Sequence, residues 1–318
     1  MGVVNTEKLD MSVNAEKVSV EKFAEALNLE ILFEGRGDLV LNSISVSRPG
    51  LQLTGYFNHF DHNRVQLIGN AEHEYLLSMK EKDRDKNLDE LFKRDIPCII
   101  LANNLQCLPA LLKYAKKYNC PFFLSKQITT VLAHELTIYQ EELLAPTLIS
   151  HGVLVEVFGV GVLITGKAGI GKSETALDLI TRGHRLVADD SVVIKNIGEN
   201  LMGKSPEKIQ YFMEVRGIGV INVRTMYGPG AIRPIKTVDM IVDLVKWDDS
   251  ARYDRLGDIK VKTEVLGVMV PKLTIPVTPG RKIPAIIETA ARKFRLDEAG
   301  YDATNELLTR TFGDKKQN

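Results

Sequence analysis

The alternation of apolar and polar positions divides the first half of the chain into short strands and helices. Residues 18–35 fit a short helix, with Ser19 as its N-cap, followed by a strand. Farther along, strand-like and helix-like runs alternate in the order 64–69 (strand), 71–80 (helix), 97–103 (strand), 107–118 (helix), 121–125 (strand) and 126–145 (helix). Such alternation predicts a parallel sheet with helices packed on it.

The second half is richer in strand patterns. Residues 154–165 indicate two strands joined by a tight turn at Phe158–Gly161, and residues 184–195 indicate a strand, an acidic turn and a strand. Between them, residues 172–182 have a helical pattern with Ala176, Leu179 and Ile180 on the inner face, and Gly183 stands where a helix ends. Further β-rich runs are 217–223, 238–247 and 264–277, and the last predicted helices are 284–296 and 301–312. We therefore predict an α/β protein with one domain over residues 1–135 and another over residues 136–318.

A glycine-rich segment lies between the second of these strands and the following helix. It reads Gly166-x4-Gly171-Lys172-Ser173, which is the Walker A pattern of a phosphate-binding loop. Glycine lets consecutive backbone N–H groups face one concavity, and the helix presents its positive end to the same place. Lys172 would contact the β- and γ-phosphates, and the Ser173 hydroxyl would ligate Mg²⁺. The predicted nucleotide contacts, called the phosphate loop below, are Gly166, Lys167, Ala168, Gly169, Ile170, Gly171, Lys172 and Ser173.

Two acidic residues, Asp189 and Asp190, follow the phosphate loop at a turn between strands. A carboxylate here could accept the proton of an attacking hydroxyl or bind a metal ion, but aspartates are also common in solvated turns. The residues alone leave both interpretations open. The chain lacks H-R-D, D-F-G and the valine-lysine strand motif, so it is not an ordinary protein kinase.

Composition excludes several classes of function. The 41 basic residues balance 41 acidic residues, which argues against a nucleic-acid-binding protein. No apolar run reaches the roughly 20 residues that span a bilayer and no signal peptide opens the chain, so we expect a cytoplasmic protein without a membrane partner. Cys98, Cys107 and Cys120 lack zinc or disulfide spacing and are expected to be reduced, buried thiols. His59 and His62 lack a third ligand at metal spacing and are interpreted as loop residues.

Four stretches together resemble bacterial HPr kinase/phosphorylase. They are "ISHGVLVEVFGVGVLITGKAGIGKSETALDLI", "HRLVADD", "MEVRGIGVINV" and "PVTPGRK", and they occur in the family's order. The resemblance implies a small Rossmann-like amino-terminal domain and a P-loop kinase domain related to the phosphoenolpyruvate carboxykinase core. It also implies an enzyme that phosphorylates a serine of the phosphocarrier HPr with ATP or pyrophosphate. Members remove that phosphate with inorganic phosphate, releasing pyrophosphate, and thereby control carbon catabolite repression and sugar uptake.

The resemblance assigns roles to residues in the matching stretches. Asp190 would accept the serine proton during phosphorylation and return it during dephosphorylation. Ser173 and Glu214 would hold Mg²⁺. Because members are hexamers whose neighbouring subunits help to bind HPr, the resemblance also implies a homo-oligomer.

Further positions match the family's active site. They are His151, Lys172 and Arg255, although His151 and Arg255 taken by themselves are ordinary loop residues. The segment that resembles the family's dephosphorylation loop consists of Pro276, Val277, Thr278, Pro279, Gly280 and Arg281. Members commonly have Asn after that arginine, where this chain has Lys282.

Two other functions fit a phosphate loop. One is a small-molecule phosphotransferase of the carboxykinase type, which would not need a loop for dephosphorylating HPr. The other is a nucleotide-regulated binding protein that catalyses no transfer. Residues 1–16 match no feature of the family.

Overall fold

The computed structural model describes residues 15–247 and 261–312. The chain divides into two compact units, residues 1–145 and 146–318. The sequence predicted a boundary after residue 135, but that position lies inside helix α6 (Thr129–Leu144), which belongs entirely to the first unit.

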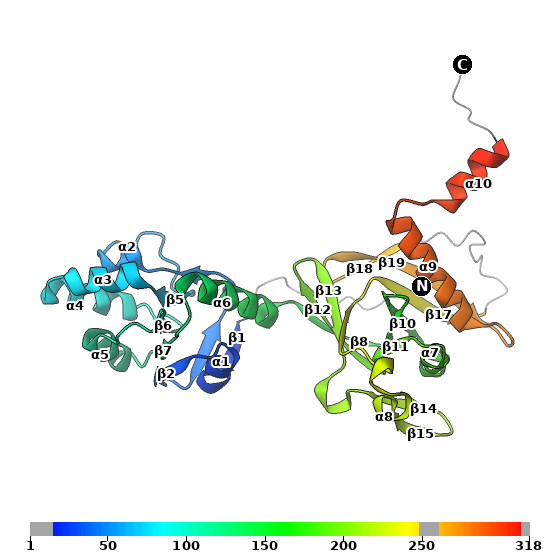
Figure 1. Ribbon diagram of the computed structural model, residues 1–318, viewed down its shortest axis with the longest axis horizontal. Coiled ribbons are helices and arrows are strands. Elements are labelled where there is room, and N and C mark those ends of the chain that lie inside the picture. Colours follow the sequence, from blue (N-terminus) through cyan, green and yellow to red (C-terminus); the bar gives the residue numbers. More distant parts are fainter. Residues whose placement is uncertain (1–14, 248–260, 313–318) are drawn as a thin grey trace, which may run out of the picture. The chain divides into compact units, whose positions relative to one another are not determined.

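Over residues 15–145 the first unit combines short strands with six helices (Figure 1). Its strands are β1 (Glu16–Ser19), β2 (Glu30–Phe33), β3 (Asp38–Leu41), β4 (Val46–Ser47), β5 (Val65–Ile68), β6 (Ile99–Leu101) and β7 (Phe122–Leu124). Its helices are α1 (Val20–Ala26), α2 (Gly50–Leu53), α3 (Asn70–Ser78), α4 (Glu81–Phe92), α5 (Pro109–Lys117) and α6. Ser19 caps α1 as predicted, since its side chain accepts a hydrogen bond from the Lys22 amide at 3.3 Å.

A five-stranded sheet of order β2-β7-β6-β5-β4 forms the centre of this unit. Strands β4 to β7 are parallel, as the alternating pattern predicted, and β2 joins the edge antiparallel to β7. Alternate strand residues face opposite sides, so Leu67 packs with α1 and α6, whereas Ile68 packs with α2 to α5. The sheet is therefore covered by helices on both faces.

The second unit is built mainly from strands (Figure 1). They are β8 (Thr147–His151), β9 (Val153–Val157), β10 (Val160–Gly166), β11 (Arg185–Ala188), β12 (Ser191–Ile197), β13 (Asn200–Lys204), β14 (Phe212–Val215), β15 (Gly219–Asn222), β16 (Ile235–Thr237), β17 (Met240–Lys246), β18 (Lys262–Val265) and β19 (Val268–Val277). Its helices are α7 (Lys172–Thr181), α8 (Val223–Tyr227), α9 (Ile283–Glu298) and α10 (Ala303–Phe312), with 3-10 turns at Glu207–Ile209 and Pro229–Ala231.

Two stacked sheets and one layer of helices organise this unit. A six-stranded sheet has the order β11-β9-β10-β17-β19-β18, and a four-stranded sheet has the order β16-β13-β12-β8. One face of the larger sheet packs against α7 and α9, and the other packs against the smaller sheet. Fully buried residues such as Val162 and Ile164 contribute about 1.5–3 kcal/mol each through burial. This burial fixes the strand that leads into the phosphate loop.

Local predictions in the second unit hold in most places. The turn between β9 and β10 has Phe158 and Gly159 at φ 51° and 84°, the geometry of a two-residue hairpin. The predicted β-rich run 264–277 covers the end of β18 and all of β19, which pair as an antiparallel hairpin. The charged helix α4 was not predicted, because only Leu88, Leu91 and Phe92 mark its buried side.

The prediction of buried thiols holds for two of the three cysteines. Cys98 and Cys120 are free and buried, and Cys107 is half-buried. Burial raises the pKa of the Cys120 thiol to about 12, so this thiol stays protonated at neutral pH. None of the helices in the described ranges is long and apolar enough to cross a bilayer.

Candidate functional site

The phosphate loop connects the buried strand β10 to helix α7. Gly166 ends β10 at φ 141°, and a Cβ built there would lie 2.5 Å from the Leu244 carbonyl oxygen of β17. Only glycine fits this close approach of two backbones. The loop therefore starts directly at the carboxyl end of a central strand.

Helix α7 begins at Lys172, and Gly171 is its N-cap. Ala176, Leu179 and Ile180 bury one face, as predicted. Beyond the C-cap, the His184 amide donates to the Leu179 carbonyl at 3.1 Å, so the helix ends in a Schellman arrangement around Gly183. Because the phosphate loop leads directly into Lys172, the amino-terminal, positive end of this ten-residue helix faces the loop.

The Lys172 ammonium group lies against its own loop. Its Nζ donates to the carbonyl oxygens of Gly166 at 3.1 Å and Lys167 at 3.4 Å. The positive charge is thus held where phosphate oxygens approach the backbone amides of such a loop.

Asp189 joins the phosphate loop to the strand that carries Glu214. The Ser173 hydroxyl donates to Asp189 Oδ1 at 2.9 Å, and the Glu214 amide donates to Asp189 Oδ2 at 3.2 Å. The structure thereby brings together Ser173 and the backbone of Glu214, the two residues predicted to hold Mg²⁺. The sequence offered no sign of this connection, which depends on residues 25 positions apart.

The two acidic residues of the turn have different environments. Asp189 is 4% exposed, and burial raises the pKa of its carboxyl, although the hydrogen bonds from Ser173 and Glu214 act in the opposite direction. Asp190 is exposed, with its backbone at φ 61°. Asp189 therefore organises the site from within, whereas the Asp190 carboxylate is open to a reacting group.

His151 lies next to Asp190 across a strand pair. It ends β8, where it pairs with Ser191 of β12, and the Gly152 amide donates to the Asp190 carbonyl at 3.2 Å. The His151 side chain is exposed. The fold therefore brings these two predicted residues to the same side of the acidic turn.

The segment Pro276–Arg281 lies at the carboxyl end of β19, on the same side of the sheet's parallel strands as the phosphate loop. Strands β10, β17 and β19 are parallel, with Gly166 aligned to Leu244 and Leu244 aligned to Ile275. Two strand spacings separate the two segments, which is about 10 Å. Arg281 Nη1 donates to the Pro276 carbonyl at 3.2 Å, so the segment forms a closed turn.

Arg216 is a functional candidate that the sequence analysis missed. It follows β14, and a Cβ built on Gly169 would lie 2.9 Å from its Nη2 and 3.2 Å from its Nη1. The guanidinium group therefore rests on the phosphate loop. Its position two residues after Glu214 could have pointed to it. The contact with Gly169, however, depends on how the β14–β15 hairpin packs, which the sequence does not show.

The remaining predicted sites have different outcomes. Arg255 lies outside the described residues. His59 and His62 lie between α2 and β5, outside any helix or strand, as the sequence predicted. Within the described ranges no group of three or more His, Cys, Asp or Glu side chains could hold a metal ion.

The residues around Ser173 fit a magnesium ion in their chemistry. The Ser173 hydroxyl and the carboxylates of Asp189 and Glu214 are oxygen donors, the ligands that Mg²⁺ prefers. Mg²⁺ uses few protein ligands and completes its shell with water and phosphate oxygens, so a large protein cluster is not required.

Comparisons with known proteins cover most of the chain. A model described as HPr Serine kinase N terminus matches residues 18–139, and one described as HPr Serine kinase C-terminal domain matches residues 142–311. The chain belongs to the HPr serine kinase family. The resemblance inferred from four sequence stretches is thus confirmed.

Members of the HPr serine kinase family from several bacteria align along nearly their whole length. An HPr kinase/phosphorylase of Alkaliphilus metalliredigens is 44% identical over 307 residues, 95% of this chain and 99% of that protein. One of Halalkalibacterium halodurans is 44% identical over 296 residues, 92% of this chain and 96% of that protein. The solved structure of the Hpr(Ser) kinase/phosphatase from Coxiella burnetii has 37% identity, covers 50% of this chain and 98% of its own, and aligns with a TM-score of 0.46.

Proposed function

We propose that this chain is a Mg²⁺-dependent enzyme that phosphorylates a serine of HPr with ATP or pyrophosphate. The same site would dephosphorylate that serine with inorganic phosphate, and the enzyme would thereby control carbon catabolite repression and sugar uptake. The observation that carries the proposal is the hydrogen-bonded chain from Ser173 through Asp189 to the Glu214 amide, beside the exposed Asp190. The names of the relatives favour this activity over a small-molecule phosphotransferase.

In the forward direction the protein would position the donor and remove one proton. The phosphate-loop amides and Lys172 would bind the β- and γ-phosphates, with Arg216 as a further cation at the loop. Mg²⁺, held by Ser173 and Glu214, would neutralise part of the phosphate charge. The Asp190 carboxylate would accept the proton as the serine oxygen bonds to the γ-phosphorus and the bond to the β-phosphate oxygen breaks.

In the reverse direction an oxygen of inorganic phosphate would attack the phosphorus of phosphoserine. The P–O bond to serine would break, Asp190 in its protonated form would return the proton to the serine oxygen, and pyrophosphate would leave. Both directions place the same charges around the same phosphorus, as microscopic reversibility requires. His151 and Arg255 would assist at this site, and Pro276–Arg281 would act in the reverse reaction, with Arg281 as an anion contact.

Further parts of the proposal concern class, assembly and location. We propose that the second unit is a P-loop kinase domain related to the phosphoenolpyruvate carboxykinase core and that the first unit is Rossmann-like. We also propose that the enzyme works in the cytoplasm. We expect it to be a homo-oligomer, specifically a hexamer. Ile218 and Val220 of the β14–β15 region are 71% and 69% exposed, which supports their burial by another protein surface.

The decisive experiment follows phosphoserine and pyrophosphate in one reaction. Purified protein with Mg²⁺, ATP and HPr should form phosphoserine, and later addition of excess phosphate should release pyrophosphate. Asp190→Asn should lose at least about 100-fold in both directions while it retains nucleotide binding, because the proton acceptor is gone and the phosphate loop is intact. Normal turnover of this variant would remove Asp190 from the mechanism. An absence of both products with the unaltered protein would refute the proposed function.

A further inference from the structure

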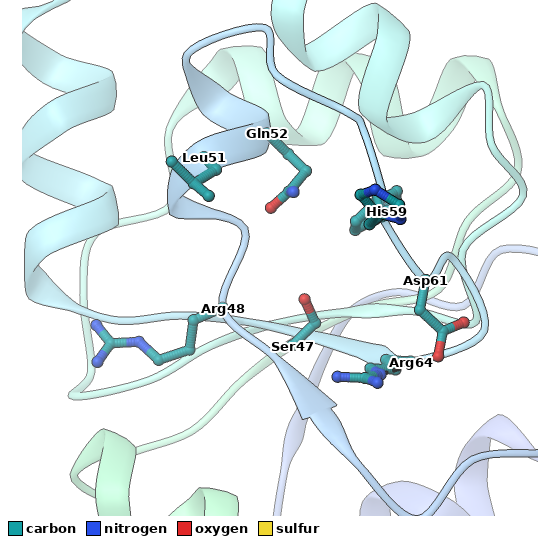
Figure 2. Close-up of a pocket in the computed structure, with 8 residues that line it drawn as sticks. Ser47, Arg48, Leu51, Gln52, His59, Asp61 and Arg64 are labelled. Carbon is teal, nitrogen blue, oxygen red and sulfur yellow. Dashed lines mark hydrogen bonds and ion pairs between the residues drawn. The ribbon is translucent and has the colours of Figure 1, made fainter.

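A polar cavity in the first unit contains none of the residues predicted for catalysis. It has a volume of about 240 Å³ and lies beside β4, α2 and the connection that leads to β5 (Figure 2). We call it the β4 cavity, and its lining residues are Ser47, Arg48, Leu51, Gln52, His59, Phe60, Asp61 and Arg64.

The fold brings the cavity's polar groups together from both ends of one connection. Ser47 ends β4, the short helix α2 supplies Gln52, and Arg64 immediately precedes β5, the parallel neighbour of β4. His59 stands between them at φ 58°, a left-handed conformation that histidine tolerates better than most residues. Figure 2 shows the side chains of Ser47 and Gln52 pointing toward one another across the cavity.

Several of these groups have hydrogen-bonding capacity to offer a ligand. Within residues 15–247 and 261–312, neither the Ser47 hydroxyl nor the His59 ring makes a hydrogen bond. Arg64 uses Nε to contact Asp61 Oδ2 at 2.9 Å, which orients the guanidinium group and leaves both Nη groups without a partner in those ranges. Arg48 differs, because its Nη2 bonds Glu72 Oε2 at 2.7 Å and Figure 2 shows the side chain turned away from the cavity.

The charges around the cavity favour an anion. Asp61 is already bonded to Arg64, so it is poorly placed to hold a cation. Beyond Phe60 lies a second cavity of about 380 Å³, lined also by His62, Glu90, Lys93 and Arg94. Lys93 and Arg94 approach Glu90 only to 3.8 and 3.9 Å. Arg64, Lys93 and Arg94 thus line the two cavities together with the carboxylates of Asp61 and Glu90, and the Arg94 guanidinium also lies 4.3 Å from the centre of the Phe57 ring.

We propose that the β4 cavity binds a small oxyanion, a phosphate or carboxylate group, through Arg64 and His59. The Nη groups of Arg64 match the paired oxygens of either group. The Ser47 hydroxyl and the Gln52 amide then contact the rest of the ligand. Because 240 Å³ is below the usual range of 300–1,000 Å³ for drug-sized ligands, the ligand is a small metabolite rather than a nucleotide.

The test must separate this cavity from the phosphate loop, which would also attract phosphate. Full-length protein is first saturated with Mg²⁺ and a non-hydrolysable ATP analogue and then titrated by calorimetry. Separate titrations use inorganic phosphate, methyl phosphate and malonate, so that a phosphate group and a carboxylate group are distinguished. We expect about one site per chain for at least one of these probes.

Two variants and a matched control decide whether that site is the β4 cavity. Arg64→Met should weaken binding at least about tenfold, because a charge-assisted contact is lost. His59→Asn removes the imidazole while Asn suits the positive φ, so it should weaken binding without unfolding the loop. Lys86→Met removes one exposed charge from α4 of the same unit and should leave binding unchanged.

Three outcomes would overturn the proposal. The first is no binding of any probe once the nucleotide analogue is bound. The second is binding that neither Arg64→Met nor His59→Asn weakens. The third is equal weakening by Lys86→Met, which would indicate an adventitious ion only. The phosphorylation of HPr is measured separately, so its failure does not bear on this site.

Discussion

At the scale of single residues, the most consequential group is the buried carboxylate of Asp189. It accepts hydrogen bonds from the Ser173 hydroxyl and the Glu214 amide, and therefore links one proposed metal ligand to the backbone of the other. Groups of this kind act by orienting ligands, and their loss typically lowers metal affinity or activity 10- to 100-fold. The same burial makes the charge of Asp189 unfavourable for folding.

The pKa of Asp189 gives a stability prediction with a definite sign. Its pKa is raised in the folded chain, so below its ordinary value of 3.8 the carboxyl is protonated in both states and costs nothing. As the pH rises from there, the unfolded chain ionises first and the wild type loses stability until the folded pKa is passed. Asp189→Asn lacks this loss because asparagine does not ionise. Its amide can still donate to Ser173 and its oxygen can still accept from the Glu214 amide. Its free energy of unfolding should therefore improve relative to wild type between about pH 4 and neutrality, while phosphorylation falls about 10- to 100-fold.

Urea unfolding over a series of pH values, together with phosphoserine assays, measures both effects. A stability difference that stays constant with pH would show that the folded state does not raise the pKa of Asp189. Unchanged kinase activity would show that the orientation of Ser173 does not depend on this carboxylate.

At the scale of elements, three neighbouring strands support the start of the phosphate loop. The Thr165 hydroxyl of β10 donates to Asp243 Oδ1 of β17 at 3.0 Å, and the Lys272 ammonium of β19 lies 2.9 Å from Asp243 Oδ2. Thr165 immediately precedes Gly166, so this chain of contacts holds the strand end at which the loop begins. Since β19 continues into Pro276–Arg281, the same contacts connect both segments at this edge of the sheet.

Thr165→Val tests this support with little change in shape. Valine keeps the volume of threonine but leaves Asp243 Oδ1 without its donor, which should cost about 1 kcal/mol of stability. The KM for ATP should rise several-fold because Gly166 is held less firmly. Thr165→Ser restores the hydroxyl and is the matched control.

Steady-state kinetics and urea unfolding of the two variants provide the comparison. If Thr165→Ser and Thr165→Val raise KM equally, the hydrogen bond to Asp243 does not position the loop. If neither variant changes KM, the backbone packing of Gly166 against Leu244 is sufficient.

The same elements show what the sequence could predict and why the rest escaped. The phosphate loop was predictable because its geometry is local: Gly166 and Gly171 need special backbone angles, and a strand and a helix flank them. The alternating elements of the first sheet were predictable for the same reason. The separate environments of Asp189 and Asp190 depend on burial by distant strands, and the contact of Arg216 with Gly169 joins segments far apart in the chain. Neither feature produces a pattern of apolar and polar positions that could be recognised in the sequence.

At the scale of the whole molecule, the hydrophobic core is divided between the two units. Among the described residues, the buried clusters of the first unit end at Phe122 and at Leu136, and Tyr139 and Leu143 pack on the second of these. The buried clusters of the second unit begin at Val153 and Leu154. Each cluster lies within one unit, and the boundary falls at Ala145 and Pro146. The described residues that carry the proposed chemistry, from His151 to Arg281, all belong to the second unit.

This division predicts that residues 146–318 fold and bind nucleotide without the first unit. Since no buried cluster loses a member, the fragment should keep a cooperative unfolding transition. Mg²⁺ and ATP at 100 times the dissociation constant should stabilise it by about 2.7 kcal/mol, the amount expected for one site. Lys172→Ala in the same fragment is the control. It should lose most of that stabilisation, because it lacks the lysine ammonium group that would contact the phosphates. A fragment that unfolds without cooperativity would show that the second unit needs the first, whereas a folded fragment that ATP does not stabilise would show that the phosphate loop is incomplete without it.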